Sequence, residues 1–177
     1  YDGIISVNGA SCRMEDGTVV ARIPVDRADL MRFVDYCREN PLPVVFATDD
    51  YAFSNMESSD IKEVFELLHI PIPEIRPLEH CLETDVMQVI AFFRPEEERY
   101  IMDNVLSGCD SYRWHPAFTD VVAKGNSKRT GIDAVLKHCG IDLSEVYAFG
   151  DGGNVLPMLR YVPNSVAMGN ASGEVKS

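Results

Sequence analysis

The sequence has few basic residues for its length. In 177 residues, 16 Lys and Arg stand against 28 Asp and Glu, which gives a formal net charge of -12. Because binding to a nucleic-acid backbone needs a basic surface, nucleic acid is not an expected partner. A small phosphorylated substrate remains compatible with this charge, since a local lysine and a metal ion outweigh the global field at contact distance.

Long apolar runs are also missing. None approaches the roughly 18 residues of a membrane span, and the first residues, Tyr1-Asp2-Gly3, show no basic leader or signal-peptide pattern. The five cysteines are an odd number without a Cys-x-x-Cys pair, which is typical of reduced thiols. The sequence therefore predicts a cytoplasmic protein that does not bind membranes.

The pattern of apolar residues changes along the chain. After Gly125 helices and strands alternate, which predicts parallel strands with crossover helices and a ligand site at the carboxyl ends of the strands. The expected elements are a helix over 128–138, a strand over 146–149, a short helix at Met158 and a strand over 165–168. We expect an α/β core made of residues 1–23 and 113–177, interrupted by an inserted α+β segment, 24–112.

Local signals mark the ends of several elements. Asp16-Gly17 predicts the two-residue turn of a hairpin, and Gly140 predicts the end of the 128–138 helix. Asp26 and Asp60 are expected to begin two further helices. The buried positions expected in the three helices are Leu30, Phe33, Val34 and Cys37, then Ile61, Val64, Phe65 and Leu68, then Ile132, Val135, Leu136 and Cys139.

The most informative stretch is the apolar strand that ends in Gly150-Asp151-Gly152-Gly153-Asn154. Glycines allow the backbone to approach a ligand closely, and the helix that follows favours anions at its start. Asp151 is a candidate Mg²⁺ ligand, because Mg²⁺ prefers carboxylate oxygens together with phosphate and water. Asn154 is a candidate phosphate donor. The alternative for both residues is a capping or turn role.

Two further residues are candidates for the site. Lys128 opens a helix, where a positive charge is unfavourable to the helix dipole, and this indicates pairing with phosphate or a carboxylate. A solvated surface lysine is the alternative. Trp114 is a candidate wall of a substrate pocket, with a core or hinge aromatic as the alternative. One stretch is similar to the phosphatase motif Asp-x-Asp-Gly-Thr, namely Met14-Glu-Asp-Gly-Thr18. Met14 stands at the position of the nucleophilic Asp, and methionine cannot attack phosphorus, so a hairpin turn is expected there.

Taken together, these stretches resemble the haloacid dehalogenase superfamily, specifically the Cof-type phosphatases with a C2-type cap. The matching pieces are Asp2 to Ala10, Ser127-Lys128, Tyr147 to Asn154 with Pro157-Met158-Leu159, and Val166 to Ala171. The resemblance implies a parallel-sheet core with an inserted cap and a Mg²⁺-dependent phosphatase. Such an enzyme hydrolyses a small phosphorylated metabolite, for example a sugar phosphate, through an aspartyl-phosphate.

The resemblance also implies residue roles. Lys128 would stabilise the phosphate and the nucleophile, Asp151 would bind Mg²⁺, and Asn154 would hold phosphate. Asn8 and Trp114 are the candidate substrate contacts. The segment 24–112 would act as the cap that chooses the substrate.

The sequence departs from the family pattern in two places. The first strand of the family, which carries the nucleophilic Asp, is absent, and so is the Ser/Thr motif that follows it. We therefore expect this chain to be part of a longer enzyme. The loop ends in Asn154-Val155 where the family has Asn-Asp, and valine cannot bind a metal ion. These departures leave two alternatives open, a non-catalytic phosphate-binding or scaffold protein and a nucleotide-binding module.

Overall fold

The computed structural model describes residues 1–152 and 155–177 and divides the chain into two compact units. The first unit joins both ends of the chain, residues 1–22 and 126–177, and the second is the continuous segment 23–125. Residues 113–125 therefore lie in the second unit, although the sequence had placed them in the core.

Strand pairing explains this difference. β8 (Cys109–His115) and β9 (Phe118–Ala123) form an antiparallel hairpin, and β9 pairs in turn with β7 (Gln88–Ala91). A boundary after residue 112 would cut through β8 and separate β9 from its partner. The two strands at the end of the inserted segment therefore belong to its sheet.

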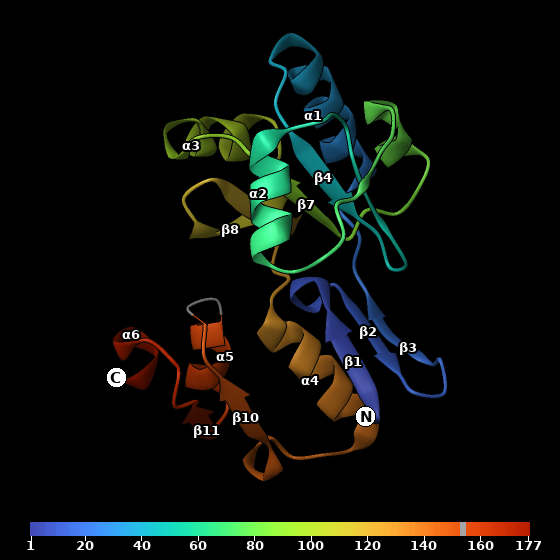
Figure 1. Cartoon of the computed structure of the whole chain (residues 1–177). Coiled ribbons are helices and arrows are strands. Elements are labelled where there is room, and N and C mark those ends of the chain that lie inside the picture. Colours follow the sequence, from blue (N-terminus) through green and yellow to red (C-terminus); the bar gives the residue numbers. More distant parts are fainter. Residues whose placement is uncertain (153–154) are drawn as a thin grey trace. The chain divides into compact units, whose positions relative to one another are not determined.

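The second unit is a six-stranded sheet with helices packed on it (Figure 1). The strand order is β6-β5-β4-β7-β9-β8, antiparallel except for the β5–β6 pair. The remaining elements of this unit are α1 (Arg27–Glu39), β4 (Val44–Ala47), β5 (Ala52–Ser54), α2 (Ser59–Leu67), β6 (Glu74–Ile75), the 3-10 helix η2 (Leu78–Leu82) and α3 (Pro95–Asn104).

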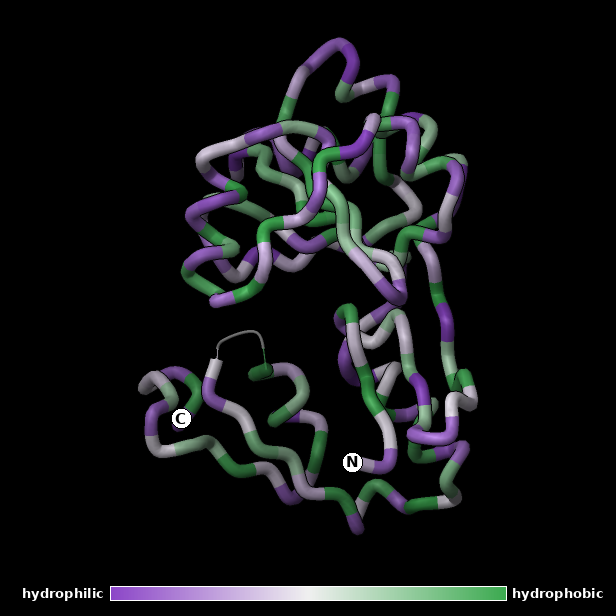
Figure 2. The backbone as a smooth tube through the Cα atoms, turned by 45° about the vertical axis from the view of Figure 1, so that its right-hand side comes forward, coloured by the Kyte–Doolittle hydropathy of each residue, from purple (hydrophilic) through white to green (hydrophobic). Residues whose placement is uncertain are grey.

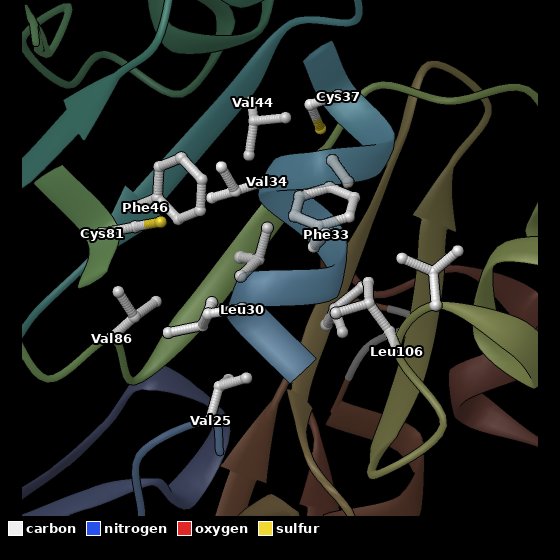
Figure 3. Packing of buried hydrophobic residues seen from close by; sticks show 14 of the residues in the cluster. Val25, Leu30, Phe33, Val34, Cys37, Val44, Phe46, Cys81, Val86 and Leu106 are labelled. Carbon is white, nitrogen blue, oxygen red and sulfur yellow. The ribbon is translucent and has the colours of Figure 1, made fainter. Parts of the chain in front are cut away.

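Alternate residues of β4 supply two separate cores. Val44 and Phe46 join the cluster beneath α1, whereas Val45 joins the cluster beneath α2. This follows from the strand geometry, because successive side chains point to opposite faces of a sheet. Figure 3 shows Leu30, Phe33 and Val34 of α1 packed against the first of these faces. In Figure 2 the interior strands are accordingly among the hydrophobic segments of this unit.

The helix starts follow the local chemistry with one shift. The Asp26 carboxylate accepts a hydrogen bond from Ala28 N at 2.7 Å and caps α1 as expected. For α2 the cap is Ser58, whose hydroxyl accepts from Asp60 N at 3.2 Å, so the helix begins at Ser59 rather than at Asp60. Leu68, expected in the core, is 41% exposed because α2 ends before it.

The first unit contains two small sheets. β1 (Gly3–Ser6), β2 (Ser11–Met14) and β3 (Val19–Arg22) form an antiparallel sheet, while β10 (Tyr147–Gly150) and β11 (Asn164–Ala167) pair in parallel. The other elements are the 3-10 helices η1 (Val7–Gly9) and η3 (Leu143–Glu145) and the helices α4 (Lys128–Cys139), α5 (Leu156–Tyr161) and α6 (Gly173–Lys176). The predicted β/α alternation after Gly125 is confirmed.

Helix α4 connects the two sheets of the first unit. It contacts η1, β2 and β3 on one side and α5 on the other. Ile132 packs against a cluster that includes Ala148 and Leu159. Gly140 ends the helix with φ 67°, the left-handed conformation that glycine adopts without strain. Cys139, expected on the buried face, is exposed at the end of the last turn.

No helix within the described residues has the length and apolar character that a membrane span requires.

Burial separates the cysteines into two chemical classes. Desolvation raises the pKa of Cys37, Cys81 and Cys109 to about 12, whereas Cys139 is exposed. We therefore expect iodoacetamide to modify Cys139 first and these three buried thiols only after unfolding in urea. Peptide mapping by mass spectrometry would measure the order, and equal modification of Cys37 and Cys139 in the folded protein would contradict it.

The same shifts give a pH dependence of stability. Thiols in the unfolded chain release their protons near the ordinary value of 9.0, while the buried thiols keep theirs to about 12. The folded state therefore binds more protons between these values, and the contribution of the thiols to stability is lost as the pH rises above 9.

Candidate functional site

The loop after β1 is fixed against the start of α4. Gly9 has φ 95°, and a Cβ on it would overlap the carbonyl oxygen of Ser127. The buried Asn126 side chain donates from Nδ2 to the carbonyl oxygen of Asn8 at 3.3 Å. The two stretches that carry Asn8 and Lys128 are thus held side by side, although more than a hundred residues separate them.

Lys128 is the first residue of α4. Ser127 caps the helix: its hydroxyl accepts from Thr130 N at 3.3 Å, and Thr130 Oγ1 accepts from Ser127 N at 2.9 Å. This reciprocal capping box fixes the start of the helix and therefore the backbone from which Lys128 extends. The Lys128 side chain is half-buried and takes part in interactions of its own.

Asp151 lies at the carboxyl end of β10, as expected. Its Oδ2 accepts a hydrogen bond from Asn170 Nδ2 at 2.8 Å. Asn170 follows the neighbouring strand β11, which is tied to β10 by its parallel pairing and by a bond from Met168 N to Gly150 O at 2.9 Å. The exposed carboxylate is therefore oriented from the next strand while it stays open to solvent.

The end of β10 and the start of α4 face the same side of the first unit (Figures 1 and 2). Asp151 directly follows β10 and Lys128 is the first residue of α4, so the backbones of both residues lie at this side. Asn8 belongs to the same side, because η1 is fixed to the start of α4.

Asn154, the expected phosphate donor, lies outside the described residues. Its neighbour Val155 is described. The Val155 backbone N donates to Gly152 O at 3.1 Å, and its side chain packs over Gly150 and against the apolar cluster around Leu159. Val155 therefore behaves as a packing residue at the start of α5.

Trp114 lies on β8 in the second unit. Its Nε1 donates to Asp120 Oδ2 at 3.0 Å, and its ring meets Phe118 edge-on with centroids 4.8 Å apart. The side chain is anchored at one end and 39% exposed overall. This arrangement fits both of the roles considered for it, a packing aromatic and a surface that a ligand can contact.

The donor set around Asp151 fits a hard divalent cation only in part. Mg²⁺ in proteins takes one or two carboxylates and completes its shell with water and phosphate oxygens. Asp151 supplies one accessible carboxylate, already oriented by Asn170. Within the described ranges no group of three His, Cys, Asp or Glu side chains forms a metal cluster. The described residues thus supply one carboxylate ligand of a metal site whose remaining ligands would be phosphate and water oxygens.

The sequence profile of the haloacid dehalogenase-like hydrolases matches residues 2–177. The chain belongs to this family. The resemblance inferred from the sequence is confirmed, and with it the fold, a haloacid dehalogenase-like α/β core with an inserted α+β cap.

Known relatives of this haloacid dehalogenase-like chain are longer than it is. The Bacillus subtilis protein named "Putative phosphatase YkrA" is 33% identical over 173 residues, which is 97% of this chain and 66% of that protein. The structure of the subclass IIB sugar phosphatase BT4131 superposes with a TM-score of 0.85 at 33% identity, over 99% of this chain and 67% of that one. BT1666 from Bacteroides thetaiotaomicron gives a TM-score of 0.84 at 34% identity and is covered to 65%.

Asn170 is the site residue to which sequence reasoning gave no role. It lies in the Val166 to Ala171 stretch that contributed to the resemblance, but no motif rule links an Asn after one strand to an Asp after the previous one. The signal was topological: adjacent parallel strands end at the same edge of a sheet, so residues that follow them become neighbours.

Proposed function

We propose that the whole protein hydrolyses small phosphate monoesters through an aspartyl-phosphate intermediate. The observation that carries the proposal is that the end of β10, which Asp151 follows, and the start of α4, which is Lys128, face the same side of a haloacid dehalogenase-like core. The nucleophilic Asp is expected outside this chain, as the absence of its motif from the sequence indicates. The relatives exceed this chain by about a third of their length, which supports a longer protein.

Each residue of the site receives a role in this proposal. Asp151 would hold Mg²⁺, with its carboxylate oriented by Asn170. Lys128 would neutralise charge on the phosphoryl group and on the attacking carboxylate. Asn154 would donate to a phosphate oxygen. When bound, Mg²⁺ supplies charge neutralisation between the carboxylates and the phosphate.

The substrate class is proposed to be a small phosphorylated metabolite, with a sugar phosphate as the first candidate. The support is the similarity to the sugar phosphatase BT4131 at 33% identity. The second unit would select the substrate, with the exposed part of Trp114 as its candidate contact. Asn8 of the first unit is the other candidate contact. A cytoplasmic location is proposed from the free thiols of all five cysteines.

The direct test uses the protein at the full length of its relatives. It should hydrolyse p-nitrophenyl phosphate with Mg²⁺, lose this activity in excess EDTA and recover it when Mg²⁺ is restored. Release of inorganic phosphate measures the rate. An unchanged rate in EDTA would rule out the metal-dependent reaction.

Val155→Asp should tighten Mg²⁺ binding, because it adds a carboxylate beside Asp151 where the family pattern has one. Val155 also stands at the N-cap of α5 without a side-chain cap bond. An Asp there gains about 1 kcal/mol from capping, which offsets part of the lost apolar packing. Calorimetric titration with Mg²⁺ measures the effect, and Val155→Asn is the control that caps the helix without adding charge. Equal affinities in the two variants would place position 155 outside the metal site.

A non-catalytic phosphate-binding protein is the second candidate, and the valine at position 155 favours it. This candidate predicts binding of inorganic phosphate without turnover in the full-length protein. The p-nitrophenyl phosphate assay therefore distinguishes the two.

A further inference from the structure

A hydroxyl, an imidazole and a carboxylate form a hydrogen-bonded row in the second unit. Tyr51 Oη lies 3.2 Å from His80 Nε2, and His80 Nδ1 lies 2.9 Å from Glu83 Oε2. The guanidinium of Arg76 adds a fourth group, with Nη1 3.3 Å from the same His80 Nε2. None of these residues belongs to the site around Asp151.

The partners of His80 assign its tautomer. An ionised Glu83 carboxylate only accepts hydrogen bonds, so the imidazole proton facing it is on Nδ1. The Arg76 guanidinium only donates, so Nε2 facing it must accept. In this tautomer Nε2 has one lone pair, which the Tyr51 hydroxyl and the Arg76 guanidinium share as donors. This is the arrangement of a nucleophile, its general base and the group that orients the base.

Neighbouring structure holds these side chains in place. The His80 ring packs edge-on against buried Phe53, with centroids 4.8 Å apart, and only 21% of its side chain is exposed. The turn before Tyr51 is closed by Thr48, whose Oγ1 accepts from Tyr51 N at 3.1 Å and donates to Tyr51 O at 2.8 Å. The backbone of Arg76 is fixed by a bond from its N to Ser54 O at 2.8 Å. The row is thus built from three anchored segments.

Tyr51 remains accessible, with 41% of its surface exposed. The Arg76 guanidinium lies 5.2 Å from the centre of the Tyr51 ring, and its Nη2 holds Glu74 at 3.1 Å. The Glu74 side chain is 77% exposed, so this ion pair is weak and the guanidinium can pair instead with an anionic reagent and with an anionic product on Tyr51 Oη. A phosphoryl group meets both conditions, whereas an acyl group gives a neutral product that gains nothing from Arg76.

We propose that Tyr51 is a nucleophilic side chain that accepts a phosphoryl group from a small acyl phosphate, with His80 as its general base. In this step the bond between Tyr51 Oη and phosphorus forms while the bond between phosphorus and the acyl oxygen breaks. The carboxylate leaves with the electron pair, and the phenolic proton passes to His80 Nε2. Glu83 stabilises the resulting imidazolium, which then releases the proton to water. Glu83 is a positioning residue, since it acts through His80.

The test incubates the protein with acetyl phosphate and locates phosphotyrosine by tandem mass spectrometry. EDTA in the buffer prevents any metal-dependent removal of the product. We expect Tyr51 to be modified at least about tenfold faster than Tyr100, because general-base help is worth that much or more. Tyr100 is more exposed, at 60%, but its hydroxyl has no hydrogen-bonded imidazole within the part of the chain that is described. The ratio of the two tyrosines in one sample serves as an internal control.

Variants separate the roles. His80→Gln should remove the preference for Tyr51, and Glu83→Gln should reduce it. Tyr100→Phe should leave the rate at Tyr51 unchanged.

An aryl sulfonyl fluoride, which reacts at a tetrahedral centre with fluoride as the leaving group, should show the same preference for Tyr51 in the unmodified sequence. Modification that follows exposure, with Tyr1, Tyr100 and Tyr147 ahead of Tyr51, would overturn the proposal, as would an unchanged preference in His80→Gln. Labelling of Tyr51 by the sulfonyl fluoride but not by acetyl phosphate would overturn the phosphoryl assignment.

Discussion

Replacing Lys128 with Met should lower the turnover of an aryl phosphate by the full-length protein by about 10²–10³-fold, the usual cost of removing one positioned electrostatic group. The ammonium would act on the charge of the phosphoryl group in transfer, so kcat should fall more than KM rises. Steady-state hydrolysis of p-nitrophenyl phosphate at saturating Mg²⁺ measures both constants.

Stability should respond differently from activity. Lys128 occupies the first turn of α4, where a cation opposes the helix dipole by about 0.3–1 kcal/mol. Lys128→Met should therefore fold about as stably as the unmodified protein while it loses activity. Lys137→Met is the matched control, because Lys137 lies in the last turn of the same helix, where a cation is favourable. It should keep full activity. Equal activity in the two variants would remove Lys128 from the site.

Gly9→Ala should destabilise the protein by about 3 kcal/mol, from the strain of a positive φ together with an overlap that the packed backbone cannot relieve. The added Cβ would meet the carbonyl oxygen of Ser127, which is part of the capping box of α4. Relief requires η1 to move away from the helix, and the bond from Asn126 to Asn8 would break with it. Urea unfolding followed by circular dichroism measures the loss.

Gly17→Ala provides the control for backbone strain alone. Gly17 has φ 86°, close to the 95° of Gly9, but a Cβ there meets no atom within 4 Å. The cost should be about 1–2 kcal/mol, that of the left-handed conformation for a residue with a Cβ. If Gly9→Ala costs no more than Gly17→Ala, the contact between η1 and α4 is looser than the structure shows.

The elements with local signals could be predicted from the sequence. Asp26 caps α1 and Gly140 ends α4, because a capping side chain or a left-handed glycine acts within a few residues. The hairpin also forms, and Thr18 N donates to Asp16 Oδ1 at 2.9 Å. Its turn is not the expected two-residue Asp16-Gly17 turn, because Gly17 N donates to Met14 O at 3.0 Å and the loop runs from residue 15 to residue 18. In each of these cases the physical cause lies inside the segment that shows the pattern.

Features that depend on distant partners were harder to predict. The end of the inserted unit is set by pairing between β7 and β9, in which Ala91 faces Thr119. The sequence around residue 112 contains no local pattern that indicates this pairing. Leu68 and Cys139 have apolar spacing but lie at helix ends, where burial depends on whether another element covers them. The bond from Asn170 to Asp151 joins two loops through the register of β10 and β11. Such contacts follow from the topology and not from the segment.

The continuous second unit and the divided first unit should differ in when they can fold. Residues 23–125 contain all strands of their own sheet, so this unit can form as soon as the segment is synthesised. The first unit cannot, because α4 packs on β2 and β3 from the other side of the insertion. Closing that loop of about 100 residues costs entropy that grows only slowly with its length, and a folded insertion shortens the effective loop. Synthesis of the chain therefore favours an order in which the inserted unit folds first. The strands β1 to β3 pack against α4 only after α4 has been synthesised.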